Sequence, residues 1–311
     1  MNRYLALLFS LGLAGCSHAA KPPPVTVVLI APGAGSGYET YAAQARAGLD
    51  ACAARTGAQV SAVTADTADE TERQLILAAT ENTDAIIAIG YGAAPAVQRV
   101  AARFEKAQFA LIGAVANGPN VSSILFDDAA AARLAGTLAG LASHTHRVAV
   151  LTGSNDAIFR GEVAGFIAGA HRADAGTAVK AVDAGTFEDA AAVERAAATL
   201  YADRYDVIYA IAGKASAGAV DAAKARARAY VIAADTDQNA LAPGVVLASI
   251  VKNVDLAAAR VCDDAVSQKP ASGKVVLGAG DRGFSIVLGS QAASIAGAPA
   301  LARLKALEPL P

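Results

Sequence analysis

Residues 230–255, which read YVIAADTDQNALAPGVVLASIVKNVD, decide how this chain folds. The two apolar runs in this stretch, residues 230–234 and 245–251, have the length and the β-branched content of strands buried on both faces. Such strands are typical of parallel sheets whose two faces are covered by helices. The stretch therefore predicts an α/β fold.

A charged side chain follows each run: Asp235 and Asp237 follow the first, and Lys252 follows the second. Because the carboxyl ends of adjacent parallel strands face one crevice, where open α/β sheets bind small ligands, we expect these groups to converge there. A carboxylate accepts hydrogen bonds from hydroxyl groups and an ammonium group donates to them, so Asp235 and Lys252 suit a polyol ligand. The alternative interpretation is that both aspartates cap the next turn and that Lys252 is solvated.

Strand-like and helix-like segments alternate along the whole chain, which indicates parallel strands joined by helices. The pattern restarts after a polar segment at residues 144–146, so two similar lobes are expected. We predict a first lobe of residues 25–126 and 252–273, a second lobe of residues 127–251 and 274–300, and a C-terminal tail of residues 301–311. Because no low-complexity linker separates the lobes, several strand-like crossings are expected to form the hinge.

The composition argues against several classes of protein. The 311 residues are 54% hydrophobic but only 5% aromatic, a balance that indicates many close-packed, alanine-rich helices. The net charge of −2 predicts no nucleic-acid-binding surface. No apolar run after the N-terminus is long enough to span a membrane. No Cys/His pair has metal-ligand spacing, and neither a metal nor a cofactor is expected.

The N-terminus has the features of an export signal. A basic start and a short apolar segment lead to residues 13–16, Leu-Ala-Gly-Cys, which resemble a bacterial lipobox. Residues 1–15 are then a lipoprotein signal peptide, Cys16 carries the lipid, and residues 16–24 form an extended tether. The mature protein is expected in the cell envelope, facing the periplasm and anchored to a membrane through Cys16. An ordinary signal peptide with a coincidental cysteine is the alternative.

Two further cysteines, Cys52 and Cys262, lie inside helical patterns. In an oxidising compartment they form a disulfide if their helices are neighbours. Two buried, unpaired thiols are the other possibility, and the one that we expect.

A glycine-rich loop, Gly33-Ala34-Gly35-Ser36-Gly37, follows the first expected strand, and Asp66 follows the second. This arrangement is compatible with a dinucleotide-binding motif, in which Asp66 would bind a ribose. Glycine also serves any loop that lets a ligand approach the backbone. Export argues against the dinucleotide interpretation, because nicotinamide cofactors are not expected outside the cytoplasm.

Several segments of the chain resemble the basic membrane protein family of substrate-binding lipoproteins. The strongest match lies in residues 234–238, 242–244 and 252–255, which are similar to the family's Gly-Val-Asp-x-Asp-Gln, Ala-Pro-Gly and Lys-x-Val-Asp series. Further matches follow in family order at residues 84–91, 119–121, 134–136, 165–169 and 212–224. The resemblance covers nearly all of the mature chain. It implies the type I periplasmic-binding-protein fold, in which two Rossmann-like lobes with a multi-crossing hinge close on a ligand.

The resemblance also implies a ligand site, with departures from the family pattern. Asp235 and Lys252 are retained, so the sugar-like part of a nucleoside is the better supported part of the ligand. Tyr41 stands where the family has a Phe that stacks on the base, although a tyrosine at a helix start often serves packing. Ala42 replaces the family's Asn, and a Glu expected near Ala130 is missing.

Other candidate ligand contacts lie in loops near the same crevice. Tyr38 and Tyr91 are loop aromatics at its mouth, and Phe159 supplies an opposite wall unless it packs in the core. Gly213 is followed by Lys214, where the family has small residues, and Lys214 adds a cation near the cleft or is simply a solvated loop charge.

The resemblance implies a binding protein that is not an enzyme: a receptor that passes a nucleoside or a related solute to an ABC permease. No nucleophile with a matching base is recognisable, since Ser36 and Ser154 have no histidine at a predictable spacing. The expected partners are the small-molecule ligand, the permease and the membrane, without nucleic acid, and the protein is expected to be a monomer. A sensor lipoprotein of the same fold, which docks a signalling partner instead of a permease, is the alternative.

Overall fold

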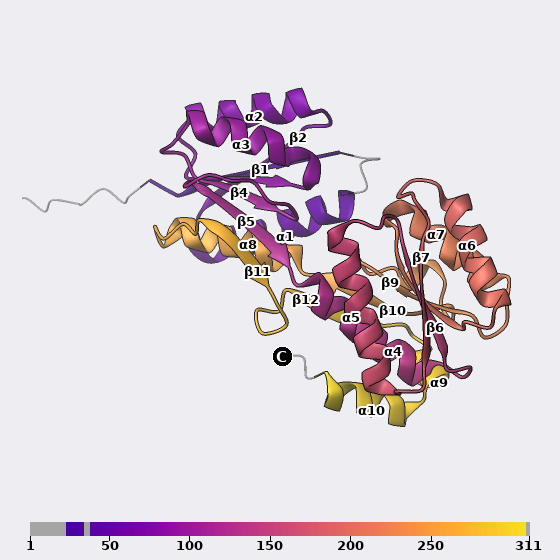
Figure 1. Cartoon of the computed structure of the whole chain (residues 1–311). Helices are drawn as coiled ribbons and strands as arrows, with labels where there is room; N and C mark the ends of the chain where they lie inside the picture. The colour runs from indigo at the N-terminus through magenta and orange to yellow at the C-terminus, as the bar shows by residue number, and fades with distance from the viewer. Residues whose placement is uncertain (1–22, 34–37, 309–311) are drawn as a thin grey trace, which may run out of the picture.

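The computed structural model describes residues 23–33 and 38–308, which form two lobes, each built around one six-stranded sheet (Figure 1). The first sheet has the order β11-β5-β4-β3-β1-β2, and all its strand pairs are parallel. Its strands are β1 (Thr26–Ala31), β2 (Gln59–Thr64), β3 (Ala85–Ile89), β4 (Phe109–Ile112), β5 (Val121–Phe126) and β11 (Gly273–Leu277).

The second sheet has the order β12-β10-β9-β8-β6-β7 and is parallel except for β12, which pairs antiparallel with β10. Its strands are β6 (Arg147–Thr152), β7 (Ala178–Asp183), β8 (Val207–Ile211), β9 (Tyr230–Ala233), β10 (Val246–Lys252) and β12 (Phe284–Leu288). Both apolar runs of residues 230–255 are therefore central strands, as predicted.

Helices cover both faces of each sheet. In the first lobe, α1 (Glu39–Thr56) and α8 (Val254–Val266) pack on one face, while α2 (Ala68–Thr80) and α3 (Ala94–Arg103) pack on the other. In the second lobe, α4 (Asp128–Ala142) and α5 (Ala157–Ala173) cover one face, and α6 (Ala190–Ala202) and α7 (Ala217–Lys224) cover the other. Alanine suits these helix faces, because its small side chain lets helix and sheet approach closely. In the part of the chain that the structure describes, no helix is long and apolar enough to cross a membrane.

Helices α4 and α5 pack closely against each other in the second lobe. A Cβ atom on Gly136 of α4 would overlap the backbone carbonyl of Phe166, and one on Gly165 of α5 would overlap the backbone carbonyl of Ala129. Only glycine permits this approach of the two backbones. The contact holds the first half of α5 beside the start of α4, where both helices reach the interlobe region.

The described chain crosses between the lobes three times: from β5 to α4, from β10 to α8, and from β11 to β12. The multi-crossing hinge is thus present. One boundary differs from our prediction, which assigned residues 274–300 to the second lobe, because β11 pairs with β5 in the first sheet. The chain returns to the second sheet only at β12, so the last crossing lies between Leu277 and Phe284.

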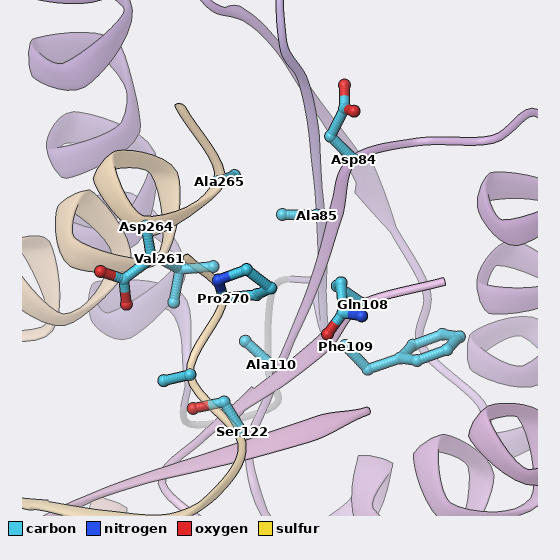
Figure 2. Close-up of a pocket in the computed structure, with 11 residues that line it drawn as sticks. Asp84, Ala85, Gln108, Phe109, Ala110, Ser122, Val261, Asp264, Ala265 and Pro270 are labelled. Carbon is cyan, nitrogen blue, oxygen red and sulfur yellow. The ribbon is translucent and has the colours of Figure 1, made fainter. Parts of the chain in front are cut away.

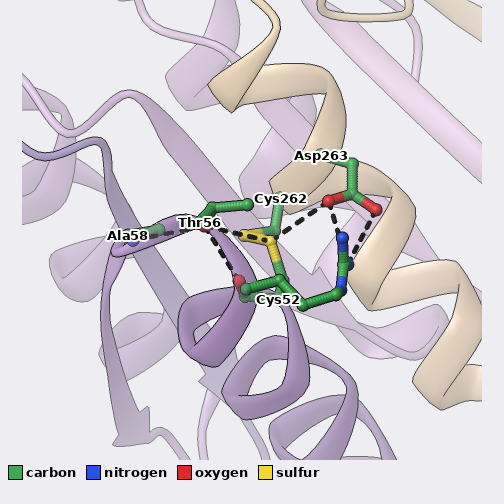
Figure 3. Close-up of a disulfide and its surroundings, with 6 residues drawn as sticks. Cys52, Thr56, Ala58, Cys262 and Asp263 are labelled. Atoms are coloured by element: carbon green, nitrogen blue, oxygen red, sulfur yellow. Dashed lines mark hydrogen bonds and ion pairs between the residues drawn. A yellow bond between two sulfur atoms is a disulfide. The ribbon is translucent and has the colours of Figure 1, made fainter.

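The prediction of two unpaired thiols is wrong, because Cys52 of α1 and Cys262 of α8 form a disulfide (Figure 3). Helices α1 and α8 pack side by side on one face of the first sheet, which brings together two cysteines that are 210 residues apart in sequence. An ion pair between Arg55 and Asp263, 3.0 Å long, lies next to the disulfide. The bond ties the segment after the second crossing to the N-terminal part of the first lobe.

The expected C-terminal tail is largely helical. Helices α9 (Ala292–Ala296) and α10 (Ala298–Leu307) pack against the second lobe, and Leu304 joins its core. Glu308 is buried, and its carboxylate lies 2.6 Å from Arg133 of α4 and 3.6 Å from Arg172 of α5. These contacts fix Glu308, the last described residue, on α4 and α5.

Candidate functional site

Lys252 is the centre of a charged cluster between the lobes. Its Nζ atom lies 2.8 Å from Oδ1 of Asp235 and 2.9 Å from Oδ1 of Asp128. Lys252 ends β10 at one crossing, Asp128 begins α4 at another, and Asp235 follows β9. The three side chains keep only 19%, 26% and 34% of their surface exposed for Lys252, Asp128 and Asp235. The convergence that we predicted for Asp235 and Lys252 is present, and Asp128 is an additional member.

The two aspartates after β9 have different roles. Asp235 has a φ of 70°, a left-handed conformation that Asp tolerates better than most residues, and its carbonyl accepts a hydrogen bond from the Lys252 amide. Asp237 instead caps the following turn, because its Oδ1 atom accepts from the Asn239 amide at 3.0 Å. The turn-capping interpretation is therefore correct for Asp237, and the solvated interpretation is wrong for Lys252.

Tyr41 joins this cluster from the first lobe. The residue is buried at 8% exposure near the start of α1, and its ring meets the Tyr38 ring edge-on at 5.8 Å. Burial raises the pKa of Tyr41 well above its usual value, and the neighbouring carboxylate of Asp235 raises it further. The hydroxyl group stays protonated beside the Asp235 carboxylate. The ring thus packs in the core while the hydroxyl reaches the polar cluster, and stacking of the ring on a ligand stays a prediction.

Asp235 and the other acidic neighbours keep Lys252 charged. Burial opposes the charge, but the attraction of Asp235, followed by that of Tyr41 and the remaining acidic groups, holds the pKa of Lys252 well above its ordinary value. The lysine is a permanent cation at the hinge.

Glu162 of α5 is a further acidic group of this cluster that the sequence analysis missed. Its exposure is only 5%. Burial raises the pKa of Glu162 to about 8; Lys252 opposes this shift, and the negative charges of Asp128 and Asp235 add to it. A signal was present in the sequence, because Phe159, Glu162 and Phe166 follow the spacing of one helix face, which places a carboxyl group on an apolar stripe.

An aromatic pair lies at the carboxyl ends of β6 and β8 in the second lobe. The rings of Phe159 and Phe187 lie 5.3 Å apart with a 41° tilt. Phe187, which the sequence analysis did not single out, lies in the loop between β7 and α6 and is 37% exposed. A Cβ atom on Gly153 would overlap the Phe187 ring, so a glycine there makes room for it. Gly213, at a φ of 53°, also borders Phe187.

The remaining predicted contacts are more peripheral. Lys214 forms a 2.9 Å ion pair with Glu188, with side chains 42% and 72% exposed. Tyr91 begins the short helix η1 (Tyr91–Ala93) after β3 and is 76% exposed. Tyr38 lies with its ring against Gly90, at the carboxyl end of β3. Of the predicted ligand contacts, Tyr41, Asp235 and Lys252 therefore lie together in one cluster. The other candidates lie in separate loops at the ends of the strands.

Asp66 has a structural role instead of a free ribose-binding position. Its Oδ1 atom accepts a 2.7 Å hydrogen bond from the amide of Gly33, at the start of the glycine-rich loop. Residues 34–37 of that loop, like Cys16 and the predicted lipobox, lie outside the described residues. Within the described ranges, no group of His, Cys, Asp and Glu is arranged to hold a metal ion.

Two cavities lie outside the charged cluster, because neither is lined by Asp235, Lys252 or Asp128. A cleft of about 410 Å³ lies between α5 and the β6–β7 side of the second sheet, and Phe159, Asn155 and Asp183 are among its lining residues. A cavity of about 20 Å³ lies at the amino ends of β3 and β4 in the first lobe, beside Asp84 and Asp264 (Figure 2). The second cavity has room for little more than a water molecule. Only the first is large enough for a small solute.

Comparison with known proteins agrees with this geometry. A family model for PnrA-like ABC transporter substrate-binding proteins, named Bmp, matches residues 25–294. The chain is 30% identical over 209 residues to the ABC transporter nucleoside-binding protein BmpA of Lactococcus lactis, covering 61% of this chain and 59% of that protein. It is 35% identical over 137 residues to basic membrane protein D of Borreliella burgdorferi, covering 44% and 40%. The chain thus spans about half the length of the curated relatives it matches.

Among solved structures, an ABC transporter solute-binding protein from Aeropyrum pernix K1 matches with a TM-score of 0.70. Its sequence identity is 23%, and the match covers 85% of this chain and 76% of that one. Together with the two helix-covered sheets, this likeness confirms the predicted periplasmic-binding-protein fold.

Proposed function

Because the chain belongs to the PnrA-like Bmp family of ABC transporter substrate-binding proteins, which bind solutes and are not enzymes, we propose that it captures a nucleoside-like solute between its lobes. In this proposal the closed protein delivers the solute to an ABC permease. The nucleoside class is supported by the similarity to a nucleoside-binding protein at 30% identity.

The observation that carries this proposal is the position of Asp235 and Lys252. Two charged side chains of opposite sign, 2.8 Å apart, lie at the carboxyl ends of neighbouring strands beside a hinge crossing. Lys252 forms ion pairs with Asp235 and Asp128, and an ammonium group has three N–H donors. A donor of Lys252 and an oxygen of Asp235 together suit two vicinal hydroxyl groups, such as those of a ribose.

The aromatic residues supply the base-binding part of the proposed site. Phe159 and Phe187 offer an apolar wall from the second lobe, next to the cleft of about 410 Å³. Tyr38, Tyr41 and Tyr91 stand on the first lobe at the ends of β1 and β3. Because Tyr41 is buried, we propose that its contact with a base requires the lobes to close and its neighbour Tyr38 to shift. Lobe closure of this kind converts binding energy into a shape that a partner recognises.

The proposal places the protein outside the cytoplasm, anchored by a lipid on Cys16. The disulfide between Cys52 and Cys262 supports this location, since disulfides persist mainly in oxidising compartments. The family is one of extracytoplasmic substrate-binding proteins. Docking to a permease and anchoring to a membrane are parts of the proposal.

Identification of the bound solute tests this function. The protein is purified under native conditions, denatured, and the released small molecules are identified by mass spectrometry. A nucleoside present in near-equal molar amount supports the proposal, and calorimetric titration with the same nucleoside then gives its affinity. A stoichiometric solute without vicinal hydroxyl groups would contradict the proposed role of Asp235 and Lys252.

A further inference from the structure

Glu162 is a buried carboxyl group that the proposed function does not use. It lies on α5 in the second lobe with 5% of its surface exposed. Among the interactions of the described residues, its carboxyl group has no hydrogen bond, and no salt bridge satisfies it. Its oxygen atoms are not among the fully enclosed, unpaired side-chain atoms of the described residues, so the carboxyl group keeps some contact with solvent, through which a ligand can reach it.

The groups that face Glu162 come from four other elements. They are Lys252 at the end of β10, Asp128 at the start of α4, Asp235 after β9, and Tyr209 in β8. The packing of α5 agrees with this placement, because Gly165 contacts the backbone of Ala129, next to Asp128, and the Phe166 ring stacks on Tyr209 at 5.8 Å. Lys252 already pairs with two carboxylates, so a third negative charge beside it is unfavourable.

Burial and this surplus of negative charge together decide the protonation state. Burial raises the pKa of Glu162 to about 8, and Asp128 and Asp235 contribute to that shift against the opposing effect of Lys252. Near neutral pH the carboxyl group is therefore protonated. A protonated carboxyl group offers one O–H donor and one carbonyl acceptor, whereas a carboxylate only accepts.

We infer that Glu162 is a further ligand-binding residue of the interlobe site, and that its carboxyl O–H donates a hydrogen bond to an uncharged acceptor of the solute, a hydroxyl oxygen or a ring nitrogen. This inference rests on the proposed function. Binding supplies the missing partner of the buried group, which explains why a carboxyl group stands on the apolar face of α5. Lobe closure excludes water and further favours the neutral acid.

The inference has a pH signature. If the solute binds the protein with Glu162 protonated, the affinity for the solute is constant below about pH 8. Above that pH, Glu162 loses its proton in the free protein, and the affinity falls by up to about tenfold per pH unit. Lys252 and Tyr41 do not interfere, because the pKa of each is raised well above its ordinary value and each keeps its charge state in this range.

Calorimetric titration with adenosine between about pH 6 and about pH 9 tests the inference on the wild type, Glu162→Gln and Glu162→Met. Glutamine keeps a donor and an acceptor but does not titrate, so the affinity of this variant, whatever its value at pH 7, is expected to stay constant up to about pH 9. Methionine fills a similar volume without a donor, and about tenfold weaker binding is expected at every pH. Melting curves confirm that both variants are folded.

Two results would overturn the inference alone: the same alkaline loss of affinity in Glu162→Gln as in the wild type, or wild-type affinity in Glu162→Met at pH 7. Failure of the wild type to bind adenosine, inosine, guanosine or uridine would overturn the proposed function, and the inference with it. The two failures are distinguishable, because the first leaves nucleoside binding intact.

Discussion

Lys252 and Asp128, whose Nζ and Oδ1 atoms lie 2.9 Å apart, connect two of the three interlobe crossings of the described chain. Lys252 stands where β10 leaves the second lobe, and Asp128 stands where α4 enters it. The same ammonium group reaches Asp235, the proposed ribose acceptor, at 2.8 Å. We therefore expect a solute that binds Lys252 to act directly on the hinge and so to couple binding to lobe movement.

Removal of the hinge ion pair tests how strongly Asp128 stabilises the protein. Asp128→Ala leaves Lys252 with one carboxylate partner fewer in a partly buried position, and we expect the free energy of unfolding to fall by about 1–3 kcal/mol. The control is Glu188→Ala, which breaks the exposed pair with Lys214 and is expected to cost less than about 1 kcal/mol. Urea unfolding followed by circular dichroism measures both. Equal losses for the two variants would contradict a special role of Asp128.

The disulfide between Cys52 and Cys262 closes a loop of 210 residues, so its removal is expected to destabilise the protein strongly. Replacement of both cysteines by alanine should lower the free energy of unfolding by about 2–5 kcal/mol, because the unfolded chain gains conformational freedom. Thermal unfolding in a Cys16→Ala background, with and without a reducing agent, measures the effect. If denatured, unreduced protein reacts with two equivalents of an alkylating agent, the bond is absent.

The pKa of Glu162 predicts how stability depends on pH. The group binds a proton in the folded protein up to about pH 8, but only up to about pH 4.5 in the unfolded chain. Between these values the folded protein holds one proton more, so the free energy of unfolding falls as the pH rises, by up to about 5 kcal/mol in total. Glu162→Gln removes this penalty and should stabilise the ligand-free protein at pH 9 but hardly at pH 5. Parallel denaturation curves at both pH values decide the question, and an equal effect at both would show that Glu162 has no raised pKa.

The anchor prediction concerns Cys16, which lies outside the described residues. Lipidation of this cysteine would attach the mature chain to a membrane. Cys16→Ala should then leave the protein in the soluble fraction of the cell envelope, while the wild type sediments with membranes. Cell fractionation followed by immunoblotting measures this. Membrane association that persists in Cys16→Ala would exclude the lipobox interpretation.

Much of the fold was predictable because strands and helices alternate with a clear apolar pattern. The predicted strands at residues 230–234 and 245–251 coincide with β9 and β10 to within one residue at each end. The sheet to which β11 belongs was not predictable, because a short edge strand carries no signal of its partner. Helix α10 was missed although Pro299 stands in its first turn, a frequent position for proline at a helix start.

The part of the site in which a charged side chain follows each of two strands was predictable, and the rest of the site was less so. Asp127 and Asp128 both read as helix-start residues, and Asp127 does cap α4 by accepting from the Ala130 amide. Only the three-dimensional path of the crossings shows that Asp128 turns to Lys252 instead. The position of Phe187 and the Cys52–Cys262 disulfide likewise result from contacts between segments that are distant in sequence. A single sequence does not show which distant segments touch.

The role of Asp235 in holding sugar hydroxyl groups is tested most directly by comparing nucleosides with their free bases. Calorimetry measures inosine against hypoxanthine and adenosine against adenine, on the wild type and on Asp235→Ala. A hydrogen bond to a charged acceptor contributes about 1.5–3 kcal/mol, so the wild type should bind each nucleoside at least tenfold more tightly than its base. Asp235→Ala should lose most of that difference and keep the affinity for the base. Equal affinities of the wild type for nucleoside and base would contradict the ribose assignment.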